Sequence, residues 1–246
     1  MISPTDGCIF ASNVNGSRNR QRKAEDMRVL TILAAASLLI VPAAVADWSD
    51  NFDSYANGSA LAGQGGWAGW EGDSTLTAYV TDDQSHSAPH SAEILPTTDC
   101  VQTFTETSGE WEMIAWMYIP SGSTGEQYFI MLNQYWPDTN NWSVQILFDS
   151  DAGIVEEYYS STTTAIVYDQ WVELKLDINL ETGFYDIYYN GTFLITWVWQ
   201  DGSGSDAIAA LDLYSNGGST IYWDDCSLMS LGALEQSTWG NIKTIF

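Results

Sequence analysis

The chain has 246 residues, of which 32 are acidic and only seven are Lys or Arg, so its formal net charge at pH 7 is −25. This balance argues against binding to nucleic acid or to an anionic membrane surface, because a protein needs basic side chains to neutralise phosphates. Acidic polysaccharides are disfavoured for the same reason, unless divalent cations bridge them. A neutral polysaccharide or glycan is the partner that the charge leaves open.

The first 46 residues are predicted to be a leader. Apolar residues rich in Ala and Leu occupy positions 30–45, Arg28 precedes them, and Ala44-Val45-Ala46 has the small-x-small pattern of a cleavage site. The apolar run is too short to span a membrane. We interpret residues 27–46 as a signal peptide, with Met27 rather than Met1 as the initiator, and expect a protein that is secreted or held at the cell surface.

Cleavage after Ala46 leaves 200 residues, with 29 acids and only Lys175 and Lys243 as bases, for a net charge of −27. This length suits one β domain, expected at 47–230, followed by a short tail at 231–246. The charge is interpreted as an aid to solubility, and cation binding is the alternative. No second apolar segment is long enough to span a membrane.

The first half of the domain reads as short strands separated by polar or Gly-rich turns. A strand rich in acids is expected at 47–55, and a Gly-rich loop at 57–66 precedes the two tryptophans Trp67 and Trp70. Further strands are predicted at 75–80, 91–95, 100–105, 110–120, 127–135, 142–148, 154–159 and 163–167. In the strand at 110–120 both faces carry large side chains, which is typical of a central strand.

The clearest pattern lies between Asp169 and Trp199. Apolar residues take every second position from Val172 to Ile178, and charged residues take the positions between them, as expected for a half-buried strand. Strands at 184–189 and 193–199 follow, and Asn190-Gly191 between them is a strong signal for a tight hairpin turn. These three strands are predicted to form an antiparallel meander.

Strands at 208–214 and 220–228 complete about twelve to fourteen strands, with no amphipathic helix of core length. Regular turn spacing and heavy aromatic and β-branched usage predict an all-β fold, with two antiparallel sheets packed as a jelly-roll sandwich. The tail differs, because Ser237 can cap a short helix that aligns apolar side chains. The tail is either a docked terminal turn or a sorting or assembly tag.

The domain holds two cysteines, Cys100 and Cys226. Two cysteines in an exported protein predict one disulfide bond, which would join an early strand to the last one. The alternative is a pair of unlinked, buried thiols.

Several segments resemble the concanavalin A-like lectin/glucanase superfamily, and more narrowly the laminin-G-like jelly rolls of secreted bacterial proteins. The residues that carry the resemblance are the following: N-F-D-S-Y at 51–55, S-H-S-A-P-H-S-A at 85–92, W-V-E-L-K-L-D-I-N-L-E-T-G at 171–183, Y-Y-N-G at 188–191 and Y-W-D-D-C-S-L at 222–228. The resemblance implies two packed sheets with a concave face that is often used for glycans. The E-x-D-x-x-E strand of the glycosidase branch and the Arg-bearing strand of the alginate-lyase branch are both absent from the domain.

A sugar platform is the first candidate site, because aromatic faces stack on pyranose rings while amides and carboxylates accept hydrogen bonds from hydroxyls. Trp116, Tyr118, Asn133, Gln145 and Glu112 are predicted to share one sheet face, with Trp142 or Tyr135 at its rim. Exposed Trp67 and Trp70 form a second predicted platform. The alternative is that the strand tryptophans belong to the core.

Two further sites are candidates. Glu110 and Glu112 alternate on one strand, about 6.5–7 Å apart at Cα, which suits a glycosidase carboxylate pair. A structural calcium ion is expected where Asp224 or Asp225 of the last strand meets Asp53 of the first segment, because calcium prefers several oxygen ligands.

These observations favour a secreted, non-catalytic carbohydrate-binding or adhesive domain, since no catalytic motif is complete. The alternatives are a glycan-cleaving enzyme with a carboxylate pair on the concave face, and a surface-structural protein that self-associates through its tail or edge strands.

Overall fold

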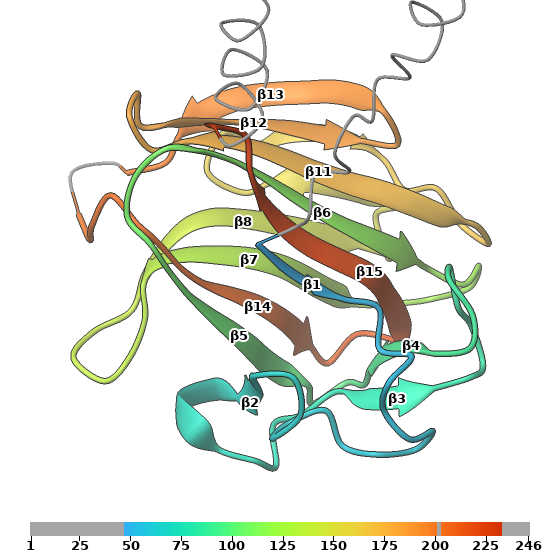
Figure 1. Cartoon of the computed structure of the whole chain (residues 1–246). Helices are drawn as coiled ribbons and strands as arrows, with labels where there is room; N and C mark the ends of the chain where they lie inside the picture. The colour runs from blue at the N-terminus through green and yellow to red at the C-terminus, as the bar shows by residue number, and fades with distance from the viewer. Residues whose placement is uncertain (1–46, 201–202, 233–246) are drawn as a thin grey trace, which may run out of the picture. The chain divides into compact units, whose positions relative to one another are not determined.

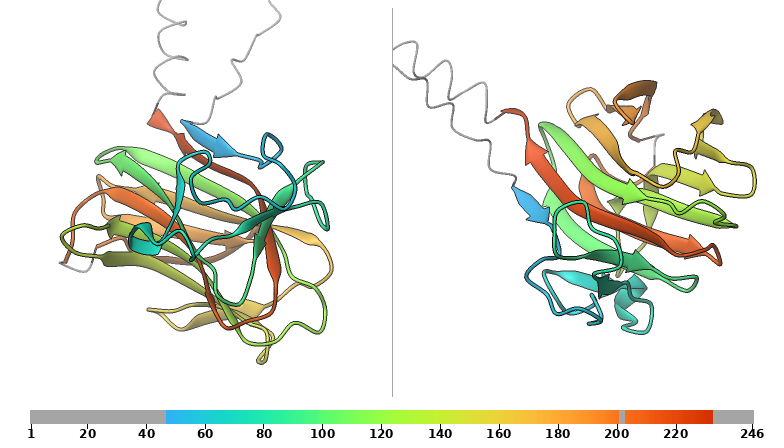
Figure 2. Two further views of the ribbon diagram at one scale, coloured as in Figure 1. Left: turned by 90° about the horizontal axis from the view of Figure 1, so that it is seen from below. Right: turned by 90° about the vertical axis from the view of Figure 1, so that its right-hand side faces the viewer.

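The computed structural model of the protein describes residues 47–200 and 203–232. The predicted leader and signal peptide, and the tail from residue 233 onward, lie outside the described residues. Within them the fold is all-β, as predicted, with fifteen strands and one short 3-10 helix, η1 (Trp70–Gly72). Two antiparallel sheets pack face to face as a sandwich that runs from Trp48 to Ser230 (Figures 1 and 2).

The first sheet has eight strands. Seven of them lie in the order β13 (Thr192–Val198), β12 (Phe184–Tyr189), β11 (Trp171–Asn179), β6 (Glu110–Tyr118), β15 (Ile221–Ser230), β4 (Ser91–Ile94) and β3 (Tyr79–Thr81). The eighth, β1 (Trp48–Asp50), pairs antiparallel with the last strand, β15, and the two lie side by side in both views of Figure 2.

The second sheet has seven strands. Their order is β10 (Thr162–Ala165), β9 (Ile154–Glu157), β8 (Asn141–Asp149), β7 (Glu126–Gln134), β14 (Ile208–Asn216), β5 (Asp99–Glu106) and β2 (Trp67–Gly69). The long strand β14 is therefore central, with β7 on one side and β5 on the other.

The predicted meander is confirmed. Strands β11, β12 and β13 pair antiparallel in chain order, and their bounds differ from the expected ones by one residue at most. Asn190 and Gly191 both have positive φ, 51° and 69°, which is what a tight primed hairpin turn requires. Leu174, Leu176 and the other alternate residues of β11 are buried, so the period of two places one face against the opposite sheet.

The core lies between the two sheets and is built from the inward-facing residues of both. Its largest fully buried side chains include Trp67, Trp199 and Trp223. Burial of such aromatic side chains is the main contribution to the stability of a sandwich of this size.

The expected disulfide is wrong, since Cys100 and Cys226 are free, buried thiols. Cys100 lies on β5 of the seven-stranded sheet, whereas Cys226 lies on β15 of the eight-stranded sheet. Both thiols therefore act as small apolar side chains of the core, and burial raises the pKa of Cys100 to about 12.

In the described part of the chain, no helix is long and apolar enough to cross a membrane.

Candidate functional site

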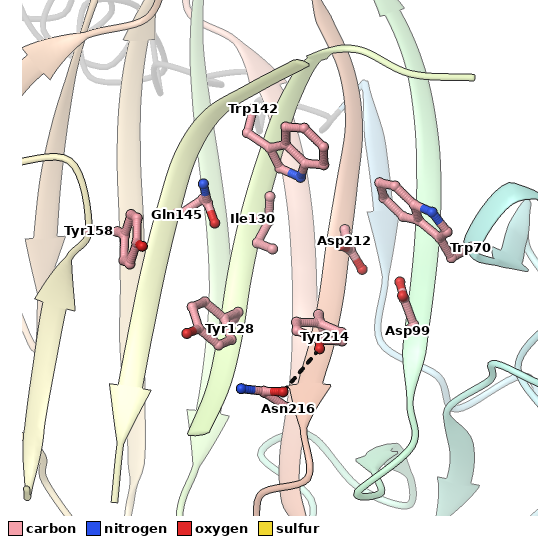
Figure 3. Close-up of a pocket in the computed structure, with 10 residues that line it drawn as sticks. All are labelled: Trp70, Asp99, Tyr128, Ile130, Trp142, Gln145, Tyr158, Asp212, Tyr214 and Asn216. Carbon is pink, nitrogen blue, oxygen red and sulfur yellow. Dashed lines mark hydrogen bonds between the residues drawn. The ribbon is translucent and has the colours of Figure 1, made fainter. Parts of the chain in front are cut away.

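A pocket of about 390 Å³ opens on the outer face of the seven-stranded sheet, the face directed away from the other sheet (Figure 3). Four strands, the 3-10 helix and the turn after β9 contribute side chains to it. The lining residues are Trp70, Asp99, Tyr128, Ile130, Trp142, Gln145, Tyr158, Asp212, Tyr214 and Asn216.

The strand period explains why these side chains share one face. On β7, Phe129 and Met131 belong to the main core between the sheets, whereas Tyr128 and Ile130 point to the outer side. The outer side has a small buried apolar cluster of its own, formed by Val101, Ile130, Leu132 and Ala210. Partly buried aromatic side chains, among them Trp70 and Tyr214, pack around this cluster. They rise above the sheet and leave a pocket between them.

The 3-10 helix η1 forms one wall of the pocket and is held in place by hydrogen bonds to the region between β7 and β8. The backbone N–H of Glu71 donates to the hydroxyl of Tyr135 at 2.7 Å, and the Asn140 amide donates to the Glu71 carboxylate at 3.0 Å. The chain before η1 is tightly packed, because a Cβ on Gly69 would lie 1.8 Å from the Asp73 carbonyl oxygen. These contacts fix the position of Trp70.

The two tryptophans at the rim have nearly parallel rings. The centroids of Trp70 and Trp142 are 6.3 Å apart with an interplanar angle of 11°, and Tyr135 meets Trp70 edge-on at 5.1 Å. Trp142 keeps 41% of its surface exposed, so its ring is available to a ligand. Next to it, the Gln145 amide donates to the Tyr159 hydroxyl at 2.7 Å, which fixes the orientation of that amide.

The opposite end of the pocket carries two tyrosines and an amide. The rings of Tyr128 and Tyr214 are 5.7 Å apart, and the Tyr214 hydroxyl donates to the Asn216 amide oxygen at 3.3 Å (Figure 3). Tyr128 and Asn216 both donate to the carboxylate of Glu126. The pocket therefore offers rings at both ends with hydrogen-bonding groups beside them.

Two carboxyl groups form the polar part of the floor. Asp212 lies on the central strand β14, and its register partners on the two neighbouring strands are Ile130 and Val101. Asp99 lies on β5 opposite Tyr214, two residue pairs further along. Figure 3 shows the two carboxyl groups directed toward each other between the strands. Asp212 is only 3% exposed.

This arrangement changes the protonation of both acids. Burial between apolar neighbours raises the pKa of Asp212 well above its usual value, and the charge of Asp99 raises it further. Burial also raises the pKa of Asp99 to about 6, although a hydrogen bond with Asp212 opposes the rise. Without a proton, the Oδ1 atoms of both acids are buried and have no donor among the described residues. Burial and the nearness of a second acid therefore both favour protonation of the pair.

No basic side chain balances these acids. Lys175 is the only Lys or Arg in residues 47–200 and 203–232, and it lies on β11 of the other sheet. Its ammonium group is already paired with Glu112 at 3.3 Å and with Asp177 at 2.8 Å. The pocket is therefore acidic, aromatic and free of basic side chains.

The structure divides the predicted sugar platform between two opposite faces. Trp70, Trp142 and Gln145 come together in the pocket, and Tyr135 lies behind Trp70. Trp116, Tyr118 and Glu112 lie instead on β6, on the outer face of the eight-stranded sheet. The prediction of one shared face is wrong because residues 119–125 lead the chain from β6 in one sheet to β7 in the other.

Two other predicted binding residues are structural. Trp67 is 1% exposed and its indole N–H donates to Asp50 at 3.0 Å, so it belongs to the core and not to an exposed platform. Asn133 is also 1% exposed, and its backbone carbonyl and side-chain oxygen accept hydrogen bonds from Ser205. Neither side chain lines the pocket.

The outer face of the eight-stranded sheet has an aromatic strip of its own. The imidazole of His86 stacks on Trp116 at 3.9 Å, and the ring of Tyr118 lies 5.7 Å from that of Trp171. His86 is held there by Asp225, whose carboxylate is 2.6 Å from the imidazole Nδ1. This strip is distinct from the pocket.

The proposed carboxylate pair of Glu110 and Glu112 lies outside the pocket as well. Both residues are on β6, where Glu112 pairs with Lys175 and Glu110 accepts a hydrogen bond from Asn179 at 2.6 Å. These contacts are structural ones between neighbouring strands.

The acids expected to bind calcium hold the chain together instead. Asp224 accepts hydrogen bonds from the backbone N–H groups of His86 and Ser87, and Asp53 accepts one from that of His90. Within the described residues, no group of three or more His, Cys, Asp or Glu side chains could hold a metal ion. No such group forms around Asp53, Asp224 and Asp225, and calcium binding stays a prediction.

Sequence reasoning missed Asp99 and Asp212. The one available signal for Asp212 is that it is the single acid in the otherwise apolar segment Ile208–Leu213, which lies in a predicted strand. Asp99 stands at the start of its strand, where an acid is unremarkable. Nothing local indicates that the two strands are neighbours.

The comparisons with known proteins show the fold. No protein-family model matches the sequence, and no curated protein matches it. A sialidase superposes with a TM-score of 0.52 at 11% identity, over 76% of this chain and 19% of that chain. The cellulose induced protein Cip1 gives a TM-score of 0.48 at 15% identity, over 75% of this chain and 97% of that chain.

An endo-β-1,4-glucuronan lyase from the fungus Trichoderma reesei gives a TM-score of 0.49 at 8% identity, over 76% of this chain and 96% of that chain. Similarity at such low identity extends to the fold alone. The sandwich is a concanavalin A-like jelly roll, in agreement with the resemblance seen in the sequence.

Proposed function

We propose that the protein is a non-catalytic carbohydrate-binding domain that holds a glycan in the pocket of the seven-stranded sheet. The observation that carries this proposal is the pocket itself, in which the rings of Trp70 and Trp142 stand beside the amide of Gln145 and the acids of the floor. Rings of this kind stack on the C–H faces of a pyranose, and amide and carboxyl oxygens accept hydrogen bonds from its hydroxyl groups.

The size and openness of the pocket support a carbohydrate ligand. Its volume of about 390 Å³ falls within the range of small-ligand sites. Trp142 and Tyr158 remain 41% and 51% exposed at its edge, so a glycan chain can extend beyond the pocket. If the predicted signal peptide acts, the domain meets its glycan outside the cell.

The proposal is tested by measuring the affinity of residues 47–246 for a panel of glycan oligomers by titration calorimetry. Trp142→Ala should lower the affinity for the most tightly bound glycan about tenfold or more, because loss of an aromatic anchor costs more than about 1 kcal/mol of binding free energy. Phe193→Ala is the matched control, since Phe193 is an exposed ring on β13 of the other sheet. Equal losses in both variants, or no binding by any glycan, would overturn the proposal.

Glycan cleavage at the same pocket is the second candidate function, and the acid pair Asp99 and Asp212 favours it, since a protonated carboxyl can act as a general acid. Figure 3 shows both carboxyl groups directed toward each other on the pocket floor, which argues against it, because glycosidases place their two carboxyl groups on either side of the scissile bond. A reducing-sugar assay separates the two functions. Release of sugar by the wild type but not by Asp99→Asn would establish cleavage.

A further inference from the structure

The acid pair on the pocket floor lacks a partner of opposite charge. Asp212 is 97% buried, it faces the pocket, and its Oδ1 atom and that of Asp99 receive no hydrogen bond from any described residue. A buried carboxylate without a donor is costly, and it is stabilised only by a proton, a hydrogen-bond donor or a cation. No described residue donates a hydrogen bond to either Oδ1 atom, and no basic side chain lines the pocket.

The surroundings of the pair favour a cation from outside. Glu71 on η1 raises the pKa of Asp99 by its negative charge, and Lys175 is committed to acids on the other sheet. The faces of Trp70 and Trp142 add to this, because an indole ring attracts an ammonium group electrostatically. Acids and rings are thus combined as they would be to receive a positively charged group.

We propose that the pocket selects glycans that carry a free, protonated amine, with the ammonium group bound by the carboxyl groups of Asp99 and Asp212 and the sugar ring stacked on Trp142. The ligand class is therefore an amino sugar in deacetylated form. This inference rests on the proposed carbohydrate-binding function and specifies its ligand. An ammonium group has three N–H donors, so one group can bind both carboxyl groups.

Other charged ligands fit the pocket less well. A uronic acid or sialic acid would bring a carboxylate against two acids with no basic side chain to receive it. Calcium takes six to eight oxygen ligands, whereas no group of three or more acidic, His or Cys side chains in the described residues is placed to hold a metal ion. An N-acetylated sugar has the same ring as the free amine but no charge, which makes it a close comparison.

The replacement of a proton by an ammonium group makes binding depend on pH. The groups that face the pair are Glu71 on η1, Tyr135 beside it, Tyr214 on β14 and the thiol of Cys100 on β5. Burial raises the pKa values of the two tyrosines and of the thiol, so all three are neutral near pH 7. Burial raises the pKa of Asp99 to about 6, so the protonation of Asp99 changes between pH 5 and pH 7. The amine stays protonated as the pH falls, so weaker binding at pH 5 would come from the pair.

The test is titration calorimetry with three tetramers, of β-1,4-linked glucosamine, glucose and N-acetylglucosamine, at pH 7 and pH 5. The wild type should bind the glucosamine tetramer at least tenfold more tightly than the glucose tetramer at pH 7. The ratio of these two affinities should be smaller at pH 5. Asp212→Asn should bring the ratio of the two affinities at pH 7 close to one, because it should weaken binding of the glucosamine tetramer far more than binding of the glucose tetramer. Its thermal transition verifies that it folds.

Asp151→Asn is the matched control, because Asp151 is an exposed acid in a turn and the substitution makes the same chemical change from carboxyl to amide. A loss of preference in this variant as well would assign the effect to the overall negative charge and overturn the inference. If Asp212→Asn does not fold, Asp99→Asn and the pH dependence of the wild type take its place. Equal affinity for glucose and glucosamine tetramers would overturn the inference and leave carbohydrate binding intact, whereas no binding of any tetramer would count against both.

Discussion

At the scale of single residues, Asp212 is the most informative position of the protein. It lies on a central strand between Ile130 and Val101, where burial disfavours its charged form. An acid on the surface would stay ionised and would contribute little to the stability of the protein. The pKa of Asp212 is therefore raised because its two neighbours on adjacent strands, Ile130 and Val101, are apolar and bury it.

The acid pair should make the stability of the protein fall as pH rises. An unfolded Asp titrates near pH 3.9, whereas the pKa of Asp99 is about 6 in the folded protein. Between these values the folded state binds more protons than the unfolded state, so protonation stabilises the fold fully below about pH 4. This stabilisation is lost as the pH rises through about 6, and further as Asp212 titrates.

Asp212→Asn should remove much of this dependence, because an amide resembles the protonated acid and can donate to Asp99. We expect its melting temperature to exceed that of the wild type by about 2–4 °C at pH 8, which corresponds to about 1 kcal/mol, with a smaller difference at pH 4. Thermal unfolding followed by circular dichroism measures this. A difference that is the same at both pH values would show that the pair is not the titrating group.

At the scale of elements, the 3-10 helix η1 positions the rim of the pocket. It presents Trp70, and the hydroxyl of Tyr135 accepts the backbone N–H of Glu71, whose φ of 50° places it in the left-handed region. A non-glycine residue in this region is strained and depends on contacts from its surroundings. The link between η1 and the end of β7 therefore maintains the wall against which a sugar would stack.

Tyr135→Phe should loosen this wall with only a small effect on the fold. Loss of one hydrogen bond costs about 0.5–1.5 kcal/mol of stability, and the Glu71 N–H is exposed enough to bind water instead. Affinity for the glycan should fall by a few fold, because Trp70 would be less firmly placed. Tyr79→Phe, which alters an exposed tyrosine on β3, is the control for removal of a hydroxyl. An unchanged affinity in Tyr135→Phe would separate η1 from binding.

At the scale of the whole molecule, the sandwich presents two aromatic faces with different characters. The seven-stranded sheet carries the pocket and its acid pair, whereas the eight-stranded sheet carries the flatter strip around Trp116, braced by His86 and Asp225. The core between them holds the sheets together with three fully buried tryptophans and no covalent cross-link among the described residues. Stability therefore depends on packing.

A reducing agent should leave the stability of the domain unchanged. Cys100 and Cys226 lie in opposite sheets as free thiols, so dithiothreitol has no disulfide to break. The melting temperature of residues 47–246 should agree with and without the reagent, and a thiol assay in denaturant should detect both cysteines. A lower melting temperature with dithiothreitol, together with a thiol count below two, would contradict the structure.

The sequence by itself determined the strands, their alternating faces and the hairpin at Asn190-Gly191, because these features depend on residues that are neighbours in the chain. It also indicated the two-sheet sandwich and the aromatic character of a ligand site. The tertiary structure alone decided which strands share a sheet. That decision separated Trp116 from Trp142, kept Cys100 apart from Cys226 and brought Asp99 beside Asp212. The physical reason is that pairing between distant strands is selected by the burial of the whole core, which no local pattern records.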